Sequence, residues 1–431
     1  MNGKKIHVIG IGGTGMNGVA QLAAHAGYSV SGSDRAEAFG ISPRRELMLA
    51  SGRQSLKNLG IEILPQDGSG ITADTDFVVY STAIESDNPD IQKAKALNIP
   101  LLHRADMLAK LCEGKEVIAV AGTAGKSTVT GLLGWIFQCL EKDPTVYCGA
   151  PVLNWKSNNV AEASSLCNQR QGCRCHSLGN VRYGTGPWII EADESDRSFL
   201  KFHPHHAVIT NIAEDHFELS ELHKLFSQFE CQVSGVVIKN FEPFTCPNPL
   251  LGKHNIENVN NALTLCKALN LDIEKCKAAV GSFKGIERRL ERVGPKVIDD
   301  FAHSPVKIAA ALEAASAEFP AFSAYWRPHG YTPLFQLADG LVEIFSSHWK
   351  KRPQDKLFIL PVYFAGGTVN IKITSEQFVE RLKAAGVPAE FVEDFQTLEK
   401  QLLAEGLPVL GMGARDPELP LFAKRLAAKI H

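Results

Sequence analysis

Short runs of apolar, β-branched residues recur along the chain, and glycine-rich or polar loops follow them. The first run, 6–10, ends in glycine and precedes a helical pattern from Met16 to about Ala26. Apolar runs of this length are typical of parallel strands that are buried on both faces. Further strands are predicted at 28–34, 76–81, 99–102, 116–121, 188–191, 207–211, 296–300, 357–361 and 408–411. Strands that alternate with helical stretches predict a doubly wound α/β fold.

The pattern of strand, polar loop and helix starts again near residue 116 and near residue 294. A chain of 431 residues has room for about three domains of ordinary size. We therefore predict three α/β domains: an N-terminal Rossmann-like domain at 1–115, a central P-loop domain at 116–293 and a C-terminal Rossmann-like domain at 294–431.

Composition narrows the class of protein. The formal net charge is −2, so the chain has no basic excess with which to neutralise nucleic-acid phosphates or bind an anionic membrane surface. The ten cysteines are too sparse for a disulfide scaffold. No apolar stretch reaches the length of a membrane span, and the N-terminus lacks a signal-peptide pattern. We expect a cytoplasmic enzyme that acts on small molecules and is either a monomer or a homodimer.

A first glycine loop, Gly10-Ile11-Gly12-Gly13-Thr14-Gly15, lies between a predicted strand and a predicted helix. Glycines in this pattern let backbone N–H groups approach a pyrophosphate at the helix N-terminus. Asp34 ends the second predicted strand, where a ribose-binding acid would lie. The pattern suits a dinucleotide cofactor such as NAD, but any nucleotide diphosphate could use the same loop.

A second loop, Gly122-Thr123-Ala124-Gly125-Lys126-Ser127-Thr128, follows the strongly apolar strand at 116–121. It is shorter than the usual phosphate-binding loop but has the same chemistry. Backbone amides and the helix N-terminus would hold phosphate oxygens, Lys126 would supply a positive charge, and the Ser127 hydroxyl could bind Mg²⁺.

Two polar segments follow later strands of the same predicted domain. One contains four acids, Glu191, Asp193, Glu194 and Asp196, and the other runs from Asn211 to His216. Ligands of open α/β sheets bind at the carboxyl ends of strands, so a carboxylate here could hold the Mg²⁺ of a bound nucleotide. A solvated acidic loop and a structural histidine are the alternatives.

Weaker candidates complete the inventory. Asn255 opens a helical stretch and suits either an N-cap or contact with a base edge, Arg288-Arg289 precedes the second boundary, and Asp299-Asp300 ends a strand. Cys167, Cys173 and Cys175 beside His176 match no common zinc spacing, so the stretch 164–180 is interpreted as an exposed loop.

Taken in order, these motifs resemble the Mur ligase family, ATP-dependent amide-forming ligases of peptidoglycan precursor synthesis. The likeness extends through Asp299-Asp300-Phe301-Ala302-His303 and Pro328-His329, and in the N-terminal part through Ser81-Thr82-Ala83-Ile84. The chain is most similar to the branches that act on UDP-N-acetylmuramate and on murein tripeptide.

The resemblance implies a reaction and a set of site residues. An amino acid, L-alanine in the branch that the motifs match best, would be joined to the carboxylate of UDP-N-acetylmuramate through an acyl phosphate, with ATP and Mg²⁺ as cofactors. Lys126, Glu191 and His216 would be catalytic, and Ser127, Glu191 and His216 would bind the metal. The implied ATP contacts are Gly122, Thr123, Gly125, Lys126, Ser127, Thr128, Asn255, Arg289 and Asp300. The implied UDP-sugar contacts are Gly12, Gly13, Thr14, Gly15, Met16, Asp34, Ser81 and Ala83.

The sequence departs from the family pattern at three positions. Ala124 and Ser304 replace histidines, and Gly330 begins a segment that is basic in the alanine-adding enzymes. A diverged member that acts on murein tripeptide or on another carboxylate is therefore the alternative function.

Overall fold

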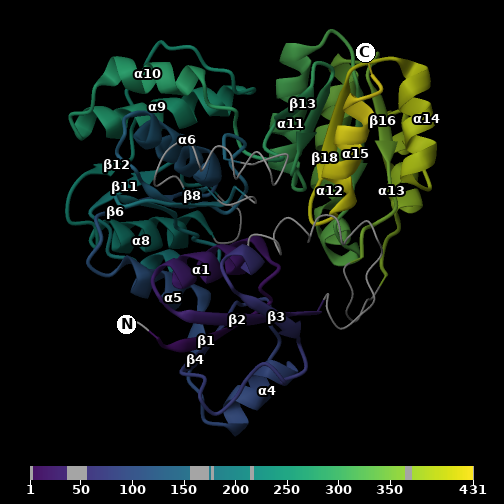
Figure 1. Cartoon of the computed structure of the whole chain (residues 1–431). Coiled ribbons are helices and arrows are strands. Elements are labelled where there is room, and N and C mark those ends of the chain that lie inside the picture. The colour runs from purple at the N-terminus through teal and green to yellow at the C-terminus, as the bar shows by residue number, and fades with distance from the viewer. Residues whose placement is uncertain are drawn as a thin grey trace. The chain divides into compact units, whose positions relative to one another are not determined.

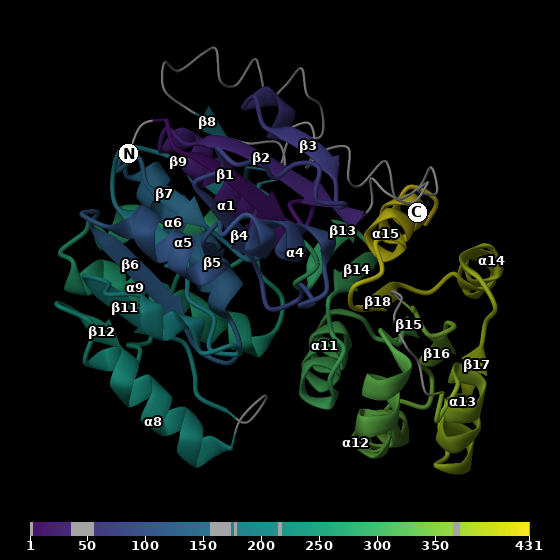
Figure 2. The same ribbon diagram turned by 90° about the horizontal axis from the view of Figure 1, so that it is seen from below.

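A computed structural model of the chain describes residues 3–35, 56–155, 179–213, 218–364 and 371–430, together with the backbone of Arg174–Cys175. The residue contacts divide the chain into two compact units, which are described one at a time (Figures 1 and 2). Unit 1 comprises Met1–Pro249 and His254–Glu287, and unit 2 comprises Leu250–Lys253 and Arg288–His431.

The first sheet of unit 1 is entirely parallel, in the order β3-β2-β1-β4-β5. Its strands are β1 (Lys5–Ile9), β2 (Ser29–Asp34), β3 (Glu62–Pro65), β4 (Phe77–Tyr80) and β5 (Leu101–His103). The helices of this part are α1 (Thr14–His25), α4 (Pro89–Ala96) and α5 (Arg104–Cys112). The strand order reverses direction beside β1, and this is the kind of switch point at which open α/β sheets bind ligands.

The second sheet of unit 1 has the order β12-β11-β6-β10-β7-β9-β8. The strands from β12 to β7 are parallel, whereas β9 and β8 are antiparallel to their neighbours. The strands are β6 (Val117–Ala121), β7 (Thr145–Tyr147), β8 (Arg174–Cys175), β9 (Val181–Tyr183), β10 (Trp188–Glu191), β11 (His206–Ile209) and β12 (Val237–Ile238). The helices are α6 (Lys126–Cys139), the 3₁₀ helix η1 (Ser198–Lys201), α8 (Leu219–Glu230), α9 (Lys253–Ala268) and α10 (Ile273–Gly281).

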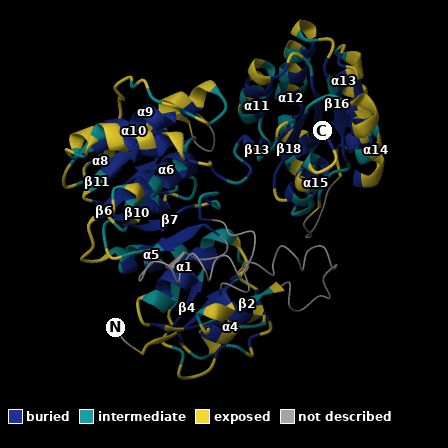
Figure 3. Ribbon diagram, turned by 45° about the horizontal axis from the view of Figure 1, so that its top comes forward, coloured by how far each residue is buried: buried dark blue, intermediate teal, exposed yellow. Residues whose placement is uncertain are grey.

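One hydrophobic cluster of unit 1 contains side chains from both of its sheets. It contains Val19 and Leu108 from α1 and α5 together with Tyr147, Val181 and Ile190 from the second sheet. Figure 3 shows β6, β7 and β10 in the colour of buried residues, whereas the exposed positions lie on the outer faces of helices such as α10. Helix α1 therefore packs against the second sheet.

Unit 2 contains a six-stranded sheet in the order β13-β14-β18-β15-β16-β17. Only the edge strand β13 is antiparallel to its neighbour. The strands are β13 (Glu291–Gly294), β14 (Val297–Asp300), β15 (Ser323–Arg327), β16 (Lys356–Ile359), β17 (Ala389–Phe391) and β18 (Val409–Gly413). The helices are α11 (Pro305–Glu318), α12 (Tyr331–Lys351), α13 (Ser375–Ala384), α14 (Phe395–Glu405) and α15 (Glu418–Ala427).

The predicted fold class is confirmed, because parallel-rich α/β sheets form in three successive regions of the chain. The predicted domain limits at residues 115 and 293 stay a prediction. The stretch 164–180 was expected to be loop throughout, but the described backbone of Arg174–Cys175 forms a short strand beside β9. Among the helices that the structure describes, none has both the length and the apolarity that crossing a membrane requires.

Candidate active site

The loop between β6 and α6 has the backbone geometry of a phosphate-binding loop. Gly122 and Gly125 have φ angles of +133° and +83°, a region that residues with a side chain rarely adopt. A Cβ atom on Gly125 would also collide with the side-chain amide of Asn258. Lys126 begins α6 directly after the loop, so Ser127 and Thr128 lie in the first helical turn, whose N–H groups are available to an anion.

The side chain of Asn211, at the end of β11, holds this loop in place. Its Oδ1 atom accepts hydrogen bonds from Thr123 Oγ1 at 2.6 Å and from the Ala124 amide at 3.0 Å. The Thr210 hydroxyl donates to the carbonyl oxygen of Ala124 at 2.5 Å. The Ala124 side chain itself is exposed, so this departure from the family pattern changes the surface of the loop and leaves its backbone contacts in place.

Lys126 is mostly buried, and its ammonium group lies among carboxylates. Nζ donates to Glu194 Oε2 at 2.6 Å and to the carbonyl oxygen of Gly122 at 2.8 Å, and Asp193 Oδ1 lies 3.8 Å away. Burial alone would lower the pKa of Lys126, but Glu194 and Asp193 outweigh burial and raise it. The lysine therefore carries its positive charge at the mouth of the loop.

Glu191, the last residue of β10, contacts the first turn of α6. Its Oε1 atom accepts from the Ser127 hydroxyl at 3.0 Å, and its Oε2 atom accepts from the Gly149 amide at 2.7 Å. The loop lysine, a hydroxyl and a carboxylate are thus brought together by β6, α6 and β10, although they are far apart in sequence.

The first glycine loop lies at the carboxyl end of β1. The carbonyl oxygen of Ser33 accepts from the amides of Gly10 and Ile11, and Asp34 Oδ2 accepts from the Gly12 amide at 2.9 Å. Asp34 therefore contacts the loop itself. Gly13, Thr14, Gly15 and Met16 form the cap and first turn of α1.

The segment after β4 lies beside the same loop. Ser81 and Ala83 belong to a turn in which the Ile84 amide donates to the carbonyl oxygen of Ser81. The Ile84 side chain lies 3.3 Å from the position that a Cβ on Gly10 would occupy. The structure thus places the turn that contains Ser81 and Ala83 near Gly10, at the start of the first glycine loop.

Two side chains of the second sheet bind the first turn of α1. Tyr147, at the end of β7, donates from its hydroxyl to the carbonyl oxygen of Gly15 at 3.1 Å. Asn180 donates to the carbonyl oxygen of Thr14 at 2.8 Å. The residues after Tyr147 lead to Gly149, whose amide holds Glu191. The end of β7 therefore links the two glycine loops.

Asn255 lies in the first turn of α9 and is buried. Its Oδ1 atom accepts from Asn258 Nδ2 at 2.8 Å, and Asn258 contacts the backbone at Gly125. Asn258 therefore connects Asn255 to the second glycine loop. Asn258 had no assigned role in the sequence-based prediction.

The other predicted site residues lie in unit 2, at the carboxyl end of its sheet. Arg288 is buried and pairs with Asp299 at 2.9 Å. Arg289 lies over the Phe301 ring. Burial raises the pKa of Asp300 to about 6, although Arg289 and the Leu290 amide oppose that shift.

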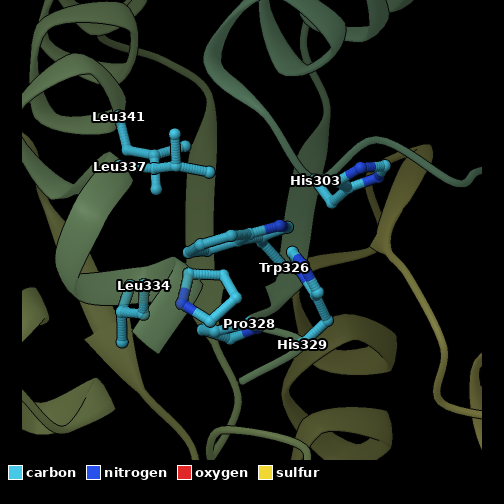
Figure 4. Close-up of a pocket in the computed structure, with 8 residues that line it drawn as sticks. His303, Trp326, Pro328, His329, Leu334, Leu337 and Leu341 are labelled. Atoms are coloured by element: carbon cyan, nitrogen blue, oxygen red, sulfur yellow. The ribbon is translucent and has the colours of Figure 1, made fainter. Parts of the chain in front are cut away.

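A hollow at the same end of this sheet is lined by two histidines on one side and by leucines of α12 on the other. Figure 4 shows His303 and His329 beside Trp326, facing Leu334, Leu337 and Leu341. The two imidazole rings are 5.0 Å apart between centroids. Burial, together with the charges of His303 and Arg415, lowers the pKa of His329 to about 4, so its ring is neutral at pH 7.

Some predicted residues lie outside the described part of the chain. His216, predicted as a catalytic and metal-binding residue, is one of them, and so is most of the cysteine-bearing stretch. Several side chains that contact the two glycine loops or their charged residues were not among the predicted site residues, including Arg104, Tyr147, Asn180, Asn258 and Glu194. Glu194 stood in an acidic run that signalled the site, whereas no motif marked Arg104 or Tyr147.

Comparison with known proteins agrees with this geometry. The sequence model of the "Mur ligase family, catalytic domain" matches residues 5–46 and 49–116. The UDP-N-acetylmuramate–L-alanine ligase of Burkholderia multivorans is 30% identical over 95% of this chain and 95% of its own. The enzyme of that name from a Psychrobacter species is also 30% identical, over 95% of this chain and 92% of its own. The chain belongs to the Mur ligase family.

Solved structures of this family share the fold. The crystal structure of UDP-N-acetylmuramate–alanine ligase from Thermotoga maritima covers 98% of this chain with a TM-score of 0.74 and 24% identity. A murein peptide ligase from Psychrobacter arcticus covers 99% with a TM-score of 0.64 and 20% identity. These similarities confirm the predicted fold of a Mur ligase over nearly the whole chain.

Proposed function

We propose that this Mur ligase joins an amino acid, L-alanine in the first instance, to the carboxylate of UDP-N-acetylmuramate with the consumption of ATP. One observation carries the proposal: two glycine loops that suit phosphates lie in the same unit. Tyr147 bonds Gly15 of the first loop and is two residues from Gly149, whose amide bonds Glu191 beside the second. Such a unit can hold two nucleotides at once, a UDP-linked acceptor at α1 and ATP at α6. A dehydrogenase that used only the first loop would leave Lys126 and its partners without a role.

Each loop would bind its ligand through backbone amides at a helix N-terminus. The UDP-sugar contacts would come from 12–16, Asp34, Ser81 and Ala83. The ATP contacts would come from 122–128 and Asn255, with Arg289 and Asp300 assigned to phosphate and ribose by the family resemblance.

The residues at the second loop suit Mg²⁺. The Glu191 carboxylate and the Ser127 hydroxyl lie 3.0 Å apart, and both present oxygen atoms, the ligands that Mg²⁺ prefers. These two residues would hold the ion, with His216 as the third predicted ligand. When bound, Mg²⁺ would neutralise negative charge on the phosphates of ATP.

Lys126 would exchange one of its present partners for the outer phosphates of ATP. It is now paired with Glu194 and lies close to Asp193, so both carboxylates can keep the ammonium group charged and oriented while the nucleotide binds. The acceptor carboxylate would then attack the terminal phosphorus of ATP, forming an acyl phosphate while the bond to the bridging oxygen breaks and ADP leaves. Attack by the amino group of the amino acid would form the amide and release inorganic phosphate.

A second candidate function uses the same chemistry with different substrates. Ala124, Ser304 and Gly330 differ from the pattern of the alanine-adding branch. Ser304 and Gly330 precede α11 and α12 at the carboxyl end of the unit 2 sheet, the edge at which such sheets bind ligands. A ligase with the same chemistry that adds murein tripeptide, or that uses another carboxylate, is the alternative.

Phosphate release separates these candidates. The protein is supplied with Mg-ATP and UDP-N-acetylmuramate, and inorganic phosphate is measured for each amino acid of a panel and for murein tripeptide. We expect release that depends on the amine and is greatest with L-alanine. Release with the tripeptide alone would support the alternative, and no amine-dependent release with any of them would contradict UDP-N-acetylmuramate as the acceptor. A Lys126→Met variant serves as the inactive control.

A further inference from the structure

Arg104 is a mostly buried arginine that lies beside the first glycine loop. It is the first residue of α5, directly after β5, and its side chain is 19% exposed. A Cβ atom placed on Gly15 would lie 3.4 Å from its Cδ atom and 3.5 Å from its Nη1 atom. The guanidinium group therefore lies against the first turn of α1, where the backbone of the loop offers N–H groups to an anion.

The contacts of Arg104 leave most of its hydrogen-bonding capacity unused. Nη1 donates to the neutral hydroxyl of Tyr147 at 2.8 Å. The Asp196 carboxylate is 3.8 Å from Nη2, which is too long for a hydrogen bond. Within the described ranges these are the polar contacts of a group that has five N–H donors. Burial lowers the pKa of Arg104, but Tyr147, Asp196 and Asp193 outweigh burial and raise it, so the guanidinium group keeps its charge while donors remain for an anion.

Acidic residues lie near both Arg104 and Lys126. Asp193 lies 3.8 Å from Lys126 Nζ, and both Lys126 and Arg104 lower the pKa of Asp193 against the opposing effect of burial. Both cations thus lie near the Asp193 carboxylate. Lys126 begins α6 after the second glycine loop, and Arg104 lies against α1.

We infer that Arg104 binds an oxyanion of the UDP-linked acceptor, with its guanidinium fork completing the site that the amides of the first glycine loop begin. This inference rests on the proposed function, because it takes the acceptor to be a UDP-sugar acid. The oxyanion has two sources in such a molecule, the diphosphate and the carboxylate that becomes phosphorylated. Tyr147 positions the fork by accepting from Nη1 while it donates to Gly15.

Equilibrium binding to the whole protein tests the inference with two ligands. UDP-N-acetylmuramate has both oxyanions, whereas UDP-N-acetylglucosamine has the diphosphate and no carboxylate. The variants are Arg104→Met, which removes the charge, and Arg104→Lys, which keeps the charge but loses the fork. Arg425→Gln is the matched control, because Arg425 pairs with Glu399 at the surface of unit 2. The thermal unfolding midpoint of each variant establishes that it is folded.

We expect Arg104→Met to weaken binding of UDP-N-acetylmuramate by roughly 10- to 100-fold, the effect of one charge-assisted interaction. Arg104→Lys should be intermediate, and Arg425→Gln should bind like the wild type. An equal loss for UDP-N-acetylglucosamine assigns Arg104 to the diphosphate, and a loss confined to UDP-N-acetylmuramate assigns it to the carboxylate.

Unchanged affinity for both ligands in folded Arg104→Met would overturn the inference. If Arg104→Met does not fold, unchanged affinity in Arg104→Lys has the same consequence, because a bidentate contact cannot survive that change. Failure of the wild type to bind UDP-N-acetylmuramate is a different result, and it would contradict the proposed function itself.

Discussion

Replacing Lys126 with methionine should destabilise the protein, apart from any effect on catalysis. The substitution leaves Glu194 without its cation. The two side chains are 14% and 3% exposed, and their charged atoms are 2.6 Å apart. Water can therefore hardly replace the lost partner, and Glu194 would be a buried carboxylate whose remaining close neighbour, Asp193, is also negative.

The magnitude follows from this burial. Removing one partner of a buried ion pair costs about 3–5 kcal/mol, and the partial exposure of Lys126 places the expected loss near 3 kcal/mol. The loss should depend on pH in a definite direction. An unpaired buried carboxylate has a raised pKa in the folded protein. The loss of unfolding free energy is therefore complete at pH 7.5, and it shrinks as the pH falls toward the unfolded pKa of about 4.3.

In the wild type, the stabilisation that comes from the charge of Lys126 is instead lost at high pH. Because the pKa of Lys126 is raised on folding, the stabilisation is complete below the unfolded pKa of about 10.4 and is lost as the pH rises through the folded pKa. Between pH 5 and pH 7.5 this contribution is constant. A change in the difference between variant and wild type over that range therefore reports on Glu194 and Asp193, the two carboxylates beside Lys126.

Urea denaturation of four proteins tests the prediction: wild type, Lys126→Met, Glu194→Gln and the double variant, at pH 7.5 and pH 5. Lys126→Met should lose about 3 kcal/mol at pH 7.5 and less at pH 5, and the double variant should recover much of the loss. Lys239→Met is the matched control, since its pair with Glu230 is exposed and should contribute less than about 1 kcal/mol. Equal unfolding free energies for Lys126→Met and the double variant at pH 7.5 would refute the reasoning.

Substitutions at Glu191, Asp300 and Gly18 give three further predictions. Glu191→Gln should raise the Mg²⁺ concentration needed for half-maximal phosphate release about tenfold or more, because a charged oxygen ligand becomes neutral; an unchanged Mg²⁺ titration would remove Glu191 from the metal site. Asp300→Asn should be up to about 2 kcal/mol more stable than the wild type at pH 7.5, with the advantage vanishing below pH 4, because the pKa of Asp300 is raised to about 6 and its carboxylate form is disfavoured on folding. Urea denaturation across that range checks this, and a constant difference would contradict it. Gly18→Ala should lose about 1–3 kcal/mol by the same measurement, since its Cβ would lie 2.8 Å from the Tyr147 ring, and a neutral result would mean that α1 can shift away from β7.

Strong local patterns in the sequence predicted the parts of the fold that they encode. The apolar runs before Gly10 and Gly122 are buried strands, and the helices begin at Thr14 and Lys126 directly after the glycines. Strands with a weaker apolar pattern escaped prediction. β7 has only three residues, and β15, although central in its sheet, begins with serine and ends with arginine, so neither forms a continuous apolar run.

The candidate site, too, was predictable only in part. The glycine loops, Lys126 and Glu191 were predictable because a phosphate site needs small residues, a cation and an acid at fixed places in a strand–loop–helix unit. Asn211 lay within a named motif, but its hold on Thr123 and Ala124 depends on β11 lying next to β6. Arg104 and Tyr147 belong to no motif, because their role comes from the packing of one sheet against another.

The sequence by itself determined the class of fold, the family and the two loops that suit phosphates, because backbone conformation and hydrophobic burial are set by residues that are close together along the chain. Only the tertiary structure decided which charges are paired. Glu194 faces Lys126, and Arg104 lies against Gly15 with Tyr147 between the two sheets. Electrostatic interactions depend on distance and burial in space, and strands that lie side by side in the sheet bring these residues together from distant parts of the chain.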